Sequence, residues 1–353
     1  MQIRFSSFVH KEMLHILRDS RTMLVVLVIP VVLILLFGFT VSTDVNNIDV
    51  AVSAPVRSEA VRRCVDRLDA GPMFNFRGYV DTEDIDLCLK TGKASAVVVF
   101  GKDYAADGEY QIIVDGADVN TAATSQLYLQ NALSGASGDR SLFEVHMLYN
   151  PQMKSAFNFV PGILGMILLL ICAMMTSISI VREKESGTME VLLVSPVKPL
   201  YIIISKMVPY LVLGCIDLAV ILLLARFALD VPLSGGIAGI VAVSVLYIVL
   251  ALALGMMVSN MAGSQIVALL ISAMVMMMPV LLFSGLIFPV ENLPWGLRWI
   301  SYVIPARWSI DAMRKMMIEG AGLSGVMLEA GILLFETLVL VAASVKKFND
   351  RLE

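Results

Sequence analysis

The chain has 353 residues, of which 58% are hydrophobic and only 16% are charged, and its mean hydropathy is +0.82. This composition lies outside the range of soluble globular proteins and indicates that a lipid bilayer surrounds much of the chain. The formal net charge of -4 offers no basic excess of the kind that binds a phosphate backbone, so nucleic acid is excluded as a partner.

The first 21 residues are predicted to form an amphipathic helix. Apolar side chains recur at helical spacing from residue 3 to residue 19, and basic and acidic side chains occupy the opposite face, among them Lys11, Glu12 and Arg18. We expect this helix to lie in the headgroup region on the cytoplasmic side of the membrane. The segment 1–21 would then lead directly into the first membrane span.

Six apolar windows are long enough to cross about 30 Å of hydrocarbon as helices. They cover residues 22–41, 159–181, 200–224, 236–258, 264–288 and 324–345. The predicted fold is therefore an α-helical polytopic membrane protein with six transmembrane helices, the last five lying within 159–345.

Basic residues near the ends of these windows indicate the orientation. Lys and Arg are frequent in the leader, in the connection between the second and third windows, and in the tail 346–353. Because cytoplasmic loops carry an excess of Lys and Arg, both termini are predicted to be cytoplasmic. The connection 289–322 would then lie outside, although it holds Arg298, Arg307, Arg314 and Lys315.

Residues 42–158 have the character of a soluble domain and should face outward. Strands are predicted at 48–53, 74–80, 96–100 and 110–114, and helices at 58–68, 82–90 and 121–133. The segment is thus expected to be a small α/β domain inserted between the first and second spans. Cys64 and Cys88 fall on its first two helices, where an oxidising compartment would permit a disulfide; two buried thiols are the alternative.

Two acidic residues interrupt the apolar windows, Asp217 in the third and Glu336 in the sixth. An ionised carboxylate at the centre of a span costs about 2.5 to 3.5 kcal/mol even on the lenient insertion scale. Both side chains should therefore face the protein interior or a wet cavity. They are the intramembrane polar residues of this chain, with a structural role preferred to contact with a substrate.

The connection 182–199 carries the most informative pattern. It reads Arg182-Glu183-Lys184-Glu185-Ser186-Gly187-Thr188-Met189-Glu190, followed by four apolar residues and Ser195-Pro196. Gly187 and the prolines punctuate its two ends, so a short rigid helix is predicted here. Its charges suit a polar groove on a soluble partner, whereas an ordinary solvated loop is the plainer interpretation.

This pattern resembles that of ABC-2-type permeases, whose motif R-E-K-E-x-G-T-x-E-x-L-L-x-S-P is filled at every specified position. The resemblance extends over the whole chain and points to the large-ectodomain branch, similar to bacterial drug and antibiotic exporters. It is carried also by Lys11-Glu12, by 18–21, by 115–121, and by 283–289, 292–294 and 302–307. The last three segments resemble the outer re-entrant region of that family, expected at 283–310, and the leader resembles its elbow helix.

The resemblance implies a membrane subunit of an ATP-driven exporter in the bacterial inner membrane. Its partners would be a separate ABC ATPase subunit, a second copy or paralogue of this chain, and, in some systems, a periplasmic adaptor. The residues implied in ATPase coupling are Arg182, Glu183, Lys184, Glu185, Gly187, Thr188, Glu190, Ser195 and Pro196. Glu183 and Glu190, which share a helix face, are the foremost candidates for contact with the ATPase.

The sequence contains no Gly-x4-Gly-Lys-Ser/Thr motif, so ATP and Mg²⁺ are expected on the partner and no cofactor on this chain. No catalytic residue and no metal site are predicted, and the chain is interpreted as non-catalytic. Two other functions remain as alternatives: a membrane-anchored sensor or assembly scaffold with a ligand-binding outer domain, and an ion-coupled secondary transporter. Vanadate-sensitive ATPase activity in a co-purified complex would separate the exporter from both.

Overall fold

The computed structural model describes residues 2–40, 48–71, 73–104, 108–115, 119–134, 155–188, 199–287, 290 and 293–349. These residues form two compact units, one made of 1–41 and 155–353 and the other of 42–154. The division falls close to the predicted boundaries of the inserted segment. Each unit is described by itself below.

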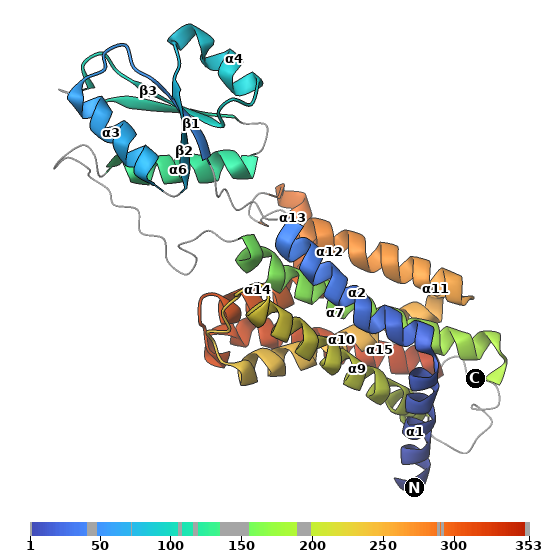
Figure 1. Cartoon of the computed structure of the whole chain (residues 1–353). Coiled ribbons are helices and arrows are strands. Elements are labelled where there is room, and N and C mark those ends of the chain that lie inside the picture. Colours follow the sequence, from blue (N-terminus) through green and yellow to red (C-terminus); the bar gives the residue numbers. More distant parts are fainter. Residues whose placement is uncertain are drawn as a thin grey trace. The chain divides into compact units, whose positions relative to one another are not determined.

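The first unit is a bundle of helices (Figure 1). Its elements are α1 (Gln2–Arg18), α2 (Ser20–Thr40), α7 (Ser155–Glu185), α9 (Pro199–Phe227), α10 (Ile237–Met261), α11 (Gln265–Ile271), the π-helix η2 (Ser272–Met277), α12 (Met278–Phe283), α13 (Trp295–Tyr302), α14 (Pro305–Met317), the short 3-10 helix η4 (Leu323–Val326) and α15 (Met327–Asn349).

Five helices in the described part of the chain are long and apolar enough to cross a membrane. They are Ala156–Glu185, Ile204–Phe227, Ile237–Met261, Gln265–Phe283 and Leu323–Ser344, and they fall on the second to sixth predicted spans. The first predicted span, 22–41, falls on α2, whose described apolar part Val26–Gly38 is shorter. The chain is a polytopic membrane protein.

Helix α7 packs against α2, α9, α10, α11 and α14 (Figure 1). Helix α10 approaches α7 closely at Gly255, where an added Cβ would lie 2.4 Å from the carbonyl oxygen of Ala173. The absence of a side chain at Gly255 therefore lets the two backbones touch. Nearer the start of α7, the Tyr247 hydroxyl of α10 donates a hydrogen bond to the carbonyl of Gly165 over 3.1 Å.

The predicted outer loop 289–322 is only partly a loop. Helix α13 exposes Trp295 and Trp299, but α14 is buried among the other helices, and Ile310, Met313 and Met316 have no exposed surface. Part of the predicted connection is thus a helix that packs within this unit. The reason is its amphipathic pattern, which combines a wide apolar face with the basic residues that suggested exposure.

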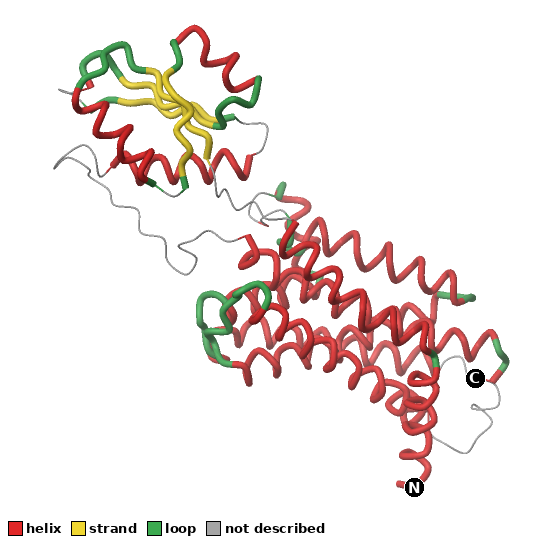
Figure 2. The backbone as a smooth tube through the Cα atoms, viewed as in Figure 1, coloured by secondary structure: helices red, strands yellow, loops and turns green. Residues whose placement is uncertain are grey.

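The second unit is an α/β domain around one four-stranded sheet (Figure 2). The strands β1 (Ile48–Ser53), β2 (Phe74–Tyr79), β3 (Ala96–Phe100) and β4 (Tyr110–Val114) are ordered β2-β1-β3-β4. Strand β1 is parallel to β2 and β3, and β4 is antiparallel to β3. The helical elements are α3 (Glu59–Ala70), η1 (Thr82–Asp84), α4 (Ile85–Lys90) and α6 (Val119–Ser134).

Alternation along the strands divides the core of this unit into two clusters. Val50, Val52 and Val98 pack with α3 and α6 in one cluster, whereas Ala51 and Val97 pack with α4 in the other. Successive side chains of a strand point to opposite faces, so the two clusters lie on opposite faces of the sheet.

The two cysteines of this unit fall in different clusters. Cys64 is buried on the α3 side, with its sulfur 3.1 Å from the Tyr104 hydroxyl, and Cys88 is buried on the α4 side. Both are free thiols. The disulfide that Cys64 and Cys88 were considered to form is therefore not present, because the sheet separates them; the alternative of two buried thiols describes the structure.

Candidate functional site

The charged residues Arg182 to Glu185 form the last turn of α7 and not a separate helix. The helix ends because Gly187 has φ of 69°, a left-handed conformation that glycine adopts without strain. The Thr188 hydroxyl donates to the Glu183 carbonyl over 3.3 Å and lies 2.9 Å from the Ser186 hydroxyl. The predicted apolar window ends at Val181, and the helix continues beyond it to Glu185.

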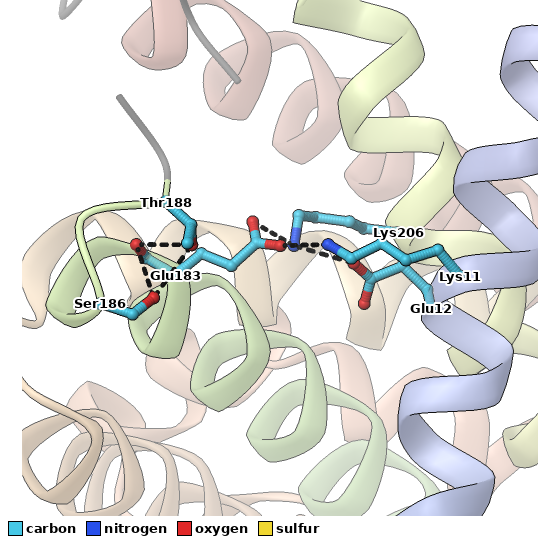
Figure 3. Close-up of polar contacts among 6 residues, drawn as sticks. All are labelled: Lys11, Glu12, Glu183, Ser186, Thr188 and Lys206. Carbon is cyan, nitrogen blue, oxygen red and sulfur yellow. Dashed lines mark hydrogen bonds and ion pairs between the residues drawn. The ribbon is translucent and has the colours of Figure 1, made fainter. Parts of the chain in front are cut away.

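Glu183 is the centre of an ion-pair network that joins three helices (Figure 3). Its carboxylate lies 2.6 Å from the Lys206 ammonium of α9 and 3.2 Å from the Lys11 ammonium of α1. Glu12 of α1 completes the network, 3.2 Å from Lys11 and 3.7 Å from Lys206. The two lysines and two glutamates balance in charge.

Three members of this network are removed from solvent. The side chains of Lys206, Glu12 and Glu183 are 6%, 7% and 12% exposed, whereas that of Lys11 is 55% exposed. Burial by itself would lower the pKa of Lys11, but the carboxylates of Glu12 and Glu183 outweigh it and raise that pKa above its ordinary value. Lys11 is therefore a full cation at neutral pH.

The other charged residues of the turn contact further helices. Arg182 donates to the Gln265 side chain of α11 over 3.2 Å and lies 3.6 Å from the Asp19 carboxylate, at the junction of α1 and α2. Lys184 donates to the Ser259 carbonyl of α10. Glu185 accepts from the backbone N–H of Gln265 over 3.1 Å and from its side chain. Side chains of this one turn of α7 thus contact α1, α9, α10 and α11.

A cavity of about 390 Å³ lies beside the network. Arg182, Glu183, Ser186, Thr188 and Tyr210 are among the residues that line it. The arrangement holds polar groups in fixed positions, but among the described residues no group of three or more His, Cys, Asp or Glu side chains is placed to hold a metal ion. The cavity is thus lined by polar groups that could bind a polar ligand or partner.

The structure changes the interpretation of Glu183. The sequence predicted that the Glu183 carboxylate contacts a partner protein. In the structure this carboxylate points toward Lys206 and Lys11 of the same chain (Figure 3). Glu190, Ser195 and Pro196 lie outside the described residues. Of the predicted coupling glutamates, Glu185 is also occupied within the chain, through Gln265.

Sequence reasoning missed Lys206 and Glu12 as members of this site. Lys206 lies inside the third predicted window, 200–224, where only Asp217 was singled out, and Glu12 was placed on the polar face of the leader helix. The signal was present: a lysine inside a long apolar helix needs an acidic partner, because an unpaired charge there is costly. Glu12 belongs to the same helix face as the buried Ile16, four residues further on.

The two acidic residues of the apolar windows, Asp217 and Glu336, do not belong to this ion-pair network. Asp217 of α9 is 1% exposed, so it faces the interior as predicted, and neither carboxyl oxygen has a hydrogen-bond partner among the described residues. Glu336 of α15 is half-buried, and its Oε2 is buried without a hydrogen-bond partner in the same part of the structure.

Comparison with known proteins assigns this architecture. The family model described as ABC-2 family transporter protein matches residues 21–346. The probable multidrug ABC transporter permeases YbhS and YbhR of Escherichia coli K12 are each 27% identical to this chain. The match to YbhS covers 88% of this chain and 87% of YbhS, and the match to YbhR covers 91% of each. ABC transporter G family member 20 of Dictyostelium discoideum is 23% identical over 89% of this chain and 46% of its own length. The chain is thus a permease homologue, and it belongs to the ABC-2 family of transporter proteins.

Proposed function

We propose that this chain is the permease subunit of an ATP-driven exporter and that a separate ATPase subunit binds at the charged end of α7. The observation that carries the proposal is the last turn of α7, whose charged side chains join α1, α9, α10 and α11 at one level. A partner that moves the following segment 189–198 would move these helices together. ATP and Mg²⁺ belong to the partner in this scheme.

In the proposed arrangement α2 is the first of six membrane spans, and both termini and the connection 182–199 are cytoplasmic. The distribution of Lys and Arg supports this orientation. The α/β unit, 42–154, is then extracytoplasmic, and the bacterial inner membrane is the location. One copy supplies half of the spans that such exporters use, so the pathway forms between two copies or between this chain and a paralogue.

The names of the relatives guide the choice of cargo. YbhS and YbhR are both named as probable multidrug permeases, which makes amphiphilic drugs the class to test first. The exposed thioethers of Met274, Met277 and Met278 suit such cargo, because methionine adapts to varied apolar shapes. A periplasmic adaptor is a further partner to test by co-purification.

The decisive variant is Glu190→Lys. Glu190 lies in the segment after α7, outside the described residues, and in the predicted helix it shares a face with Glu183. Reversing its charge should weaken binding to the ATPase by about tenfold or more, since an attractive pair becomes repulsive. The measurement is co-purification of the ATPase, together with substrate-stimulated hydrolysis and transport in reconstituted vesicles.

A matched control is Glu319→Lys, which reverses an exposed acidic residue beyond α14. It should leave ATPase binding and transport at the wild-type level. Wild-type coupling in Glu190→Lys would contradict the proposed role of the segment. Robust ATP hydrolysis by the purified chain alone would contradict the assignment of ATP to a partner.

A further inference from the structure

A wide groove of about 1020 Å³ opens between α1 and the end of α7. Four of the side chains that line it are basic: His10, Lys11, Arg18 and Arg182. Asp19 is the acidic residue among the lining, which also includes Ser7 and Leu14. The groove thus carries an excess of positive charge, although the chain as a whole is acidic.

The ion pairs within the chain leave hydrogen-bond donors available in this groove. Arg18 is exposed and forms no ion pair with another described residue, so its guanidinium can donate to a ligand in the groove. The contacts of Arg182 with Gln265 and Asp19 use two of its five N–H groups. Two arginines with open N–H groups at one groove are a suitable site for a phosphate.

An apolar surface begins next to the same groove. Leu14 and Leu17 are exposed on α1, and exposed apolar residues continue along α2 at intervals of four, at Leu24, Val28, Val32 and Leu36. Residues four apart share one helix face, so these side chains form a continuous stripe. A ligand that fits both features has an anionic head and a long apolar body.

We propose that this groove binds the headgroup of an anionic phospholipid, with its phosphate against Arg18 and Arg182 and its acyl chains along the stripe of α2. The inference rests on the proposed placement of this end of the bundle at the headgroup level of the membrane. Basic grooves at the ends of membrane helices are suited to such lipids, and the apolar stripe distinguishes a lipid from free phosphate. The bound lipid would hold α1 against the bilayer beside the Glu183 network.

The test uses the full chain purified without the ATPase. Native mass spectrometry measures the dissociation constant of the first bound phosphatidylglycerol and, separately, of phosphatidylcholine. Arg18→Gln should weaken phosphatidylglycerol binding about fivefold, the factor that corresponds to about 1 kcal/mol for one basic residue near an anionic lipid. Binding of phosphatidylcholine should not change.

The matched control is Arg226→Gln. Arg226 is likewise an exposed arginine, but it lies in the last turn of α9, at the opposite end of that helix from Lys206. Its removal should leave binding of the first phosphatidylglycerol unchanged. Both variants should give the same yield and the same thermal stability as the wild type, because both arginines are exposed and neither forms an ion pair with another described residue.

Three results would overturn the proposal: equal affinity for the two lipids, equal losses in Arg18→Gln and Arg226→Gln, or complete displacement of the lipid by inorganic phosphate at millimolar concentration. The last result would make the groove a site for free anions. Because the ATPase is absent from this experiment, a failure of lipid binding is distinct from a failure of ATPase coupling.

Discussion

Two ion-pair sites lie at opposite ends of α10, and they differ in what they join. At one end, near Ser259, Glu183 binds Lys206 and also Lys11, which lies 172 positions away in the sequence. At the other end, where Gly235 precedes α10 and bonds to Met316, Lys315 of α14 binds Glu329 of α15, only 14 positions away. The first site connects three long helices, whereas the second closes a short connection.

This difference predicts at which site the removal of a charge will destabilise the fold most. At the Glu183 site the buried Lys206 contacts the carboxylates of both Glu12 and Glu183, so its removal leaves two acids with Lys11 as the remaining cation of the network. At the second site Glu329 is buried but Lys315 is 41% exposed, so water already screens part of the pair. The network between distant helices should therefore be the more sensitive of the two.

The largest effect is expected for Lys206→Met. Removal of one partner from a buried ion pair typically destabilises by about 3 to 5 kcal/mol, and here it also releases α1 from α9. The measurement is thermal unfolding in detergent, with limited trypsin digestion at Lys11 and Arg18 as a local readout of α1.

Two variants sharpen this result. Arg226→Gln removes an exposed charge from the same helix and should leave unfolding unchanged. The double variant Lys206→Met with Glu183→Gln should recover part of the loss, because it removes both charges of the closest pair. If Lys206→Met unfolds like the wild type, the network does not hold the bundle together.

A smaller effect is expected for Lys315→Met, about 1 to 2 kcal/mol, since it leaves the buried Glu329 unpaired but loosens no distant helix. The hydrogen bond to Glu329 raises the pKa of Lys315 above its ordinary value of 10.5. A raised pKa means that the contribution is complete below the unfolded pKa and is lost only as the pH rises through the folded one. The difference from wild type should thus be constant between about pH 6 and 9; a marked change within that range would contradict this origin.

The smallest effect is expected for Gly187→Ala. The left-handed backbone at Gly187 disfavours a side chain by about 1 kcal/mol, although the surrounding space is open. Gly263→Ala is the matched control, because that glycine also has open space but no left-handed conformation. Substrate-stimulated ATPase activity should fall modestly in the first variant and not in the second. Equal activities would show that the end of α7 tolerates a different path.

The apolar helices and the strands were the parts of the fold that could be predicted from the sequence, the helices from apolar length and the strands from alternation. The second to sixth predicted spans match apolar helices because hydrophobic length decides membrane insertion locally. The four strands match because β-branched runs such as Val97 to Val99 alternate between two core faces. Neither signal depends on which segments become neighbours.

The candidate site is formed by side chains of different helices, and these contacts could not be predicted from the sequence of any one segment. The pattern 182–196 identified the end of α7 as a candidate site, but nothing local shows that Glu183 turns toward Lys206 of another helix. The separation of Cys64 from Cys88 likewise follows from the sheet between them. The burial of α14 was missed because its arginines and lysine resemble a solvated connection, whereas Arg314 donates to the Gly285 carbonyl inside the bundle.

The close packing of α7 on α10 has a mechanical consequence. The two helices touch through Gly255 and Ala173 and are hydrogen-bonded again at Gly165, so they should move as a single lever. From Gly165 to Glu183 the helical rise of 1.5 Å per residue gives an arm of about 27 Å. A tilt of about 5° applied at the Glu183 end would displace the far end by about 2 Å over that length. A small movement at the Glu183 end of the α7–α10 pair would in this way displace its Gly165 end without any change in the packing of the two helices.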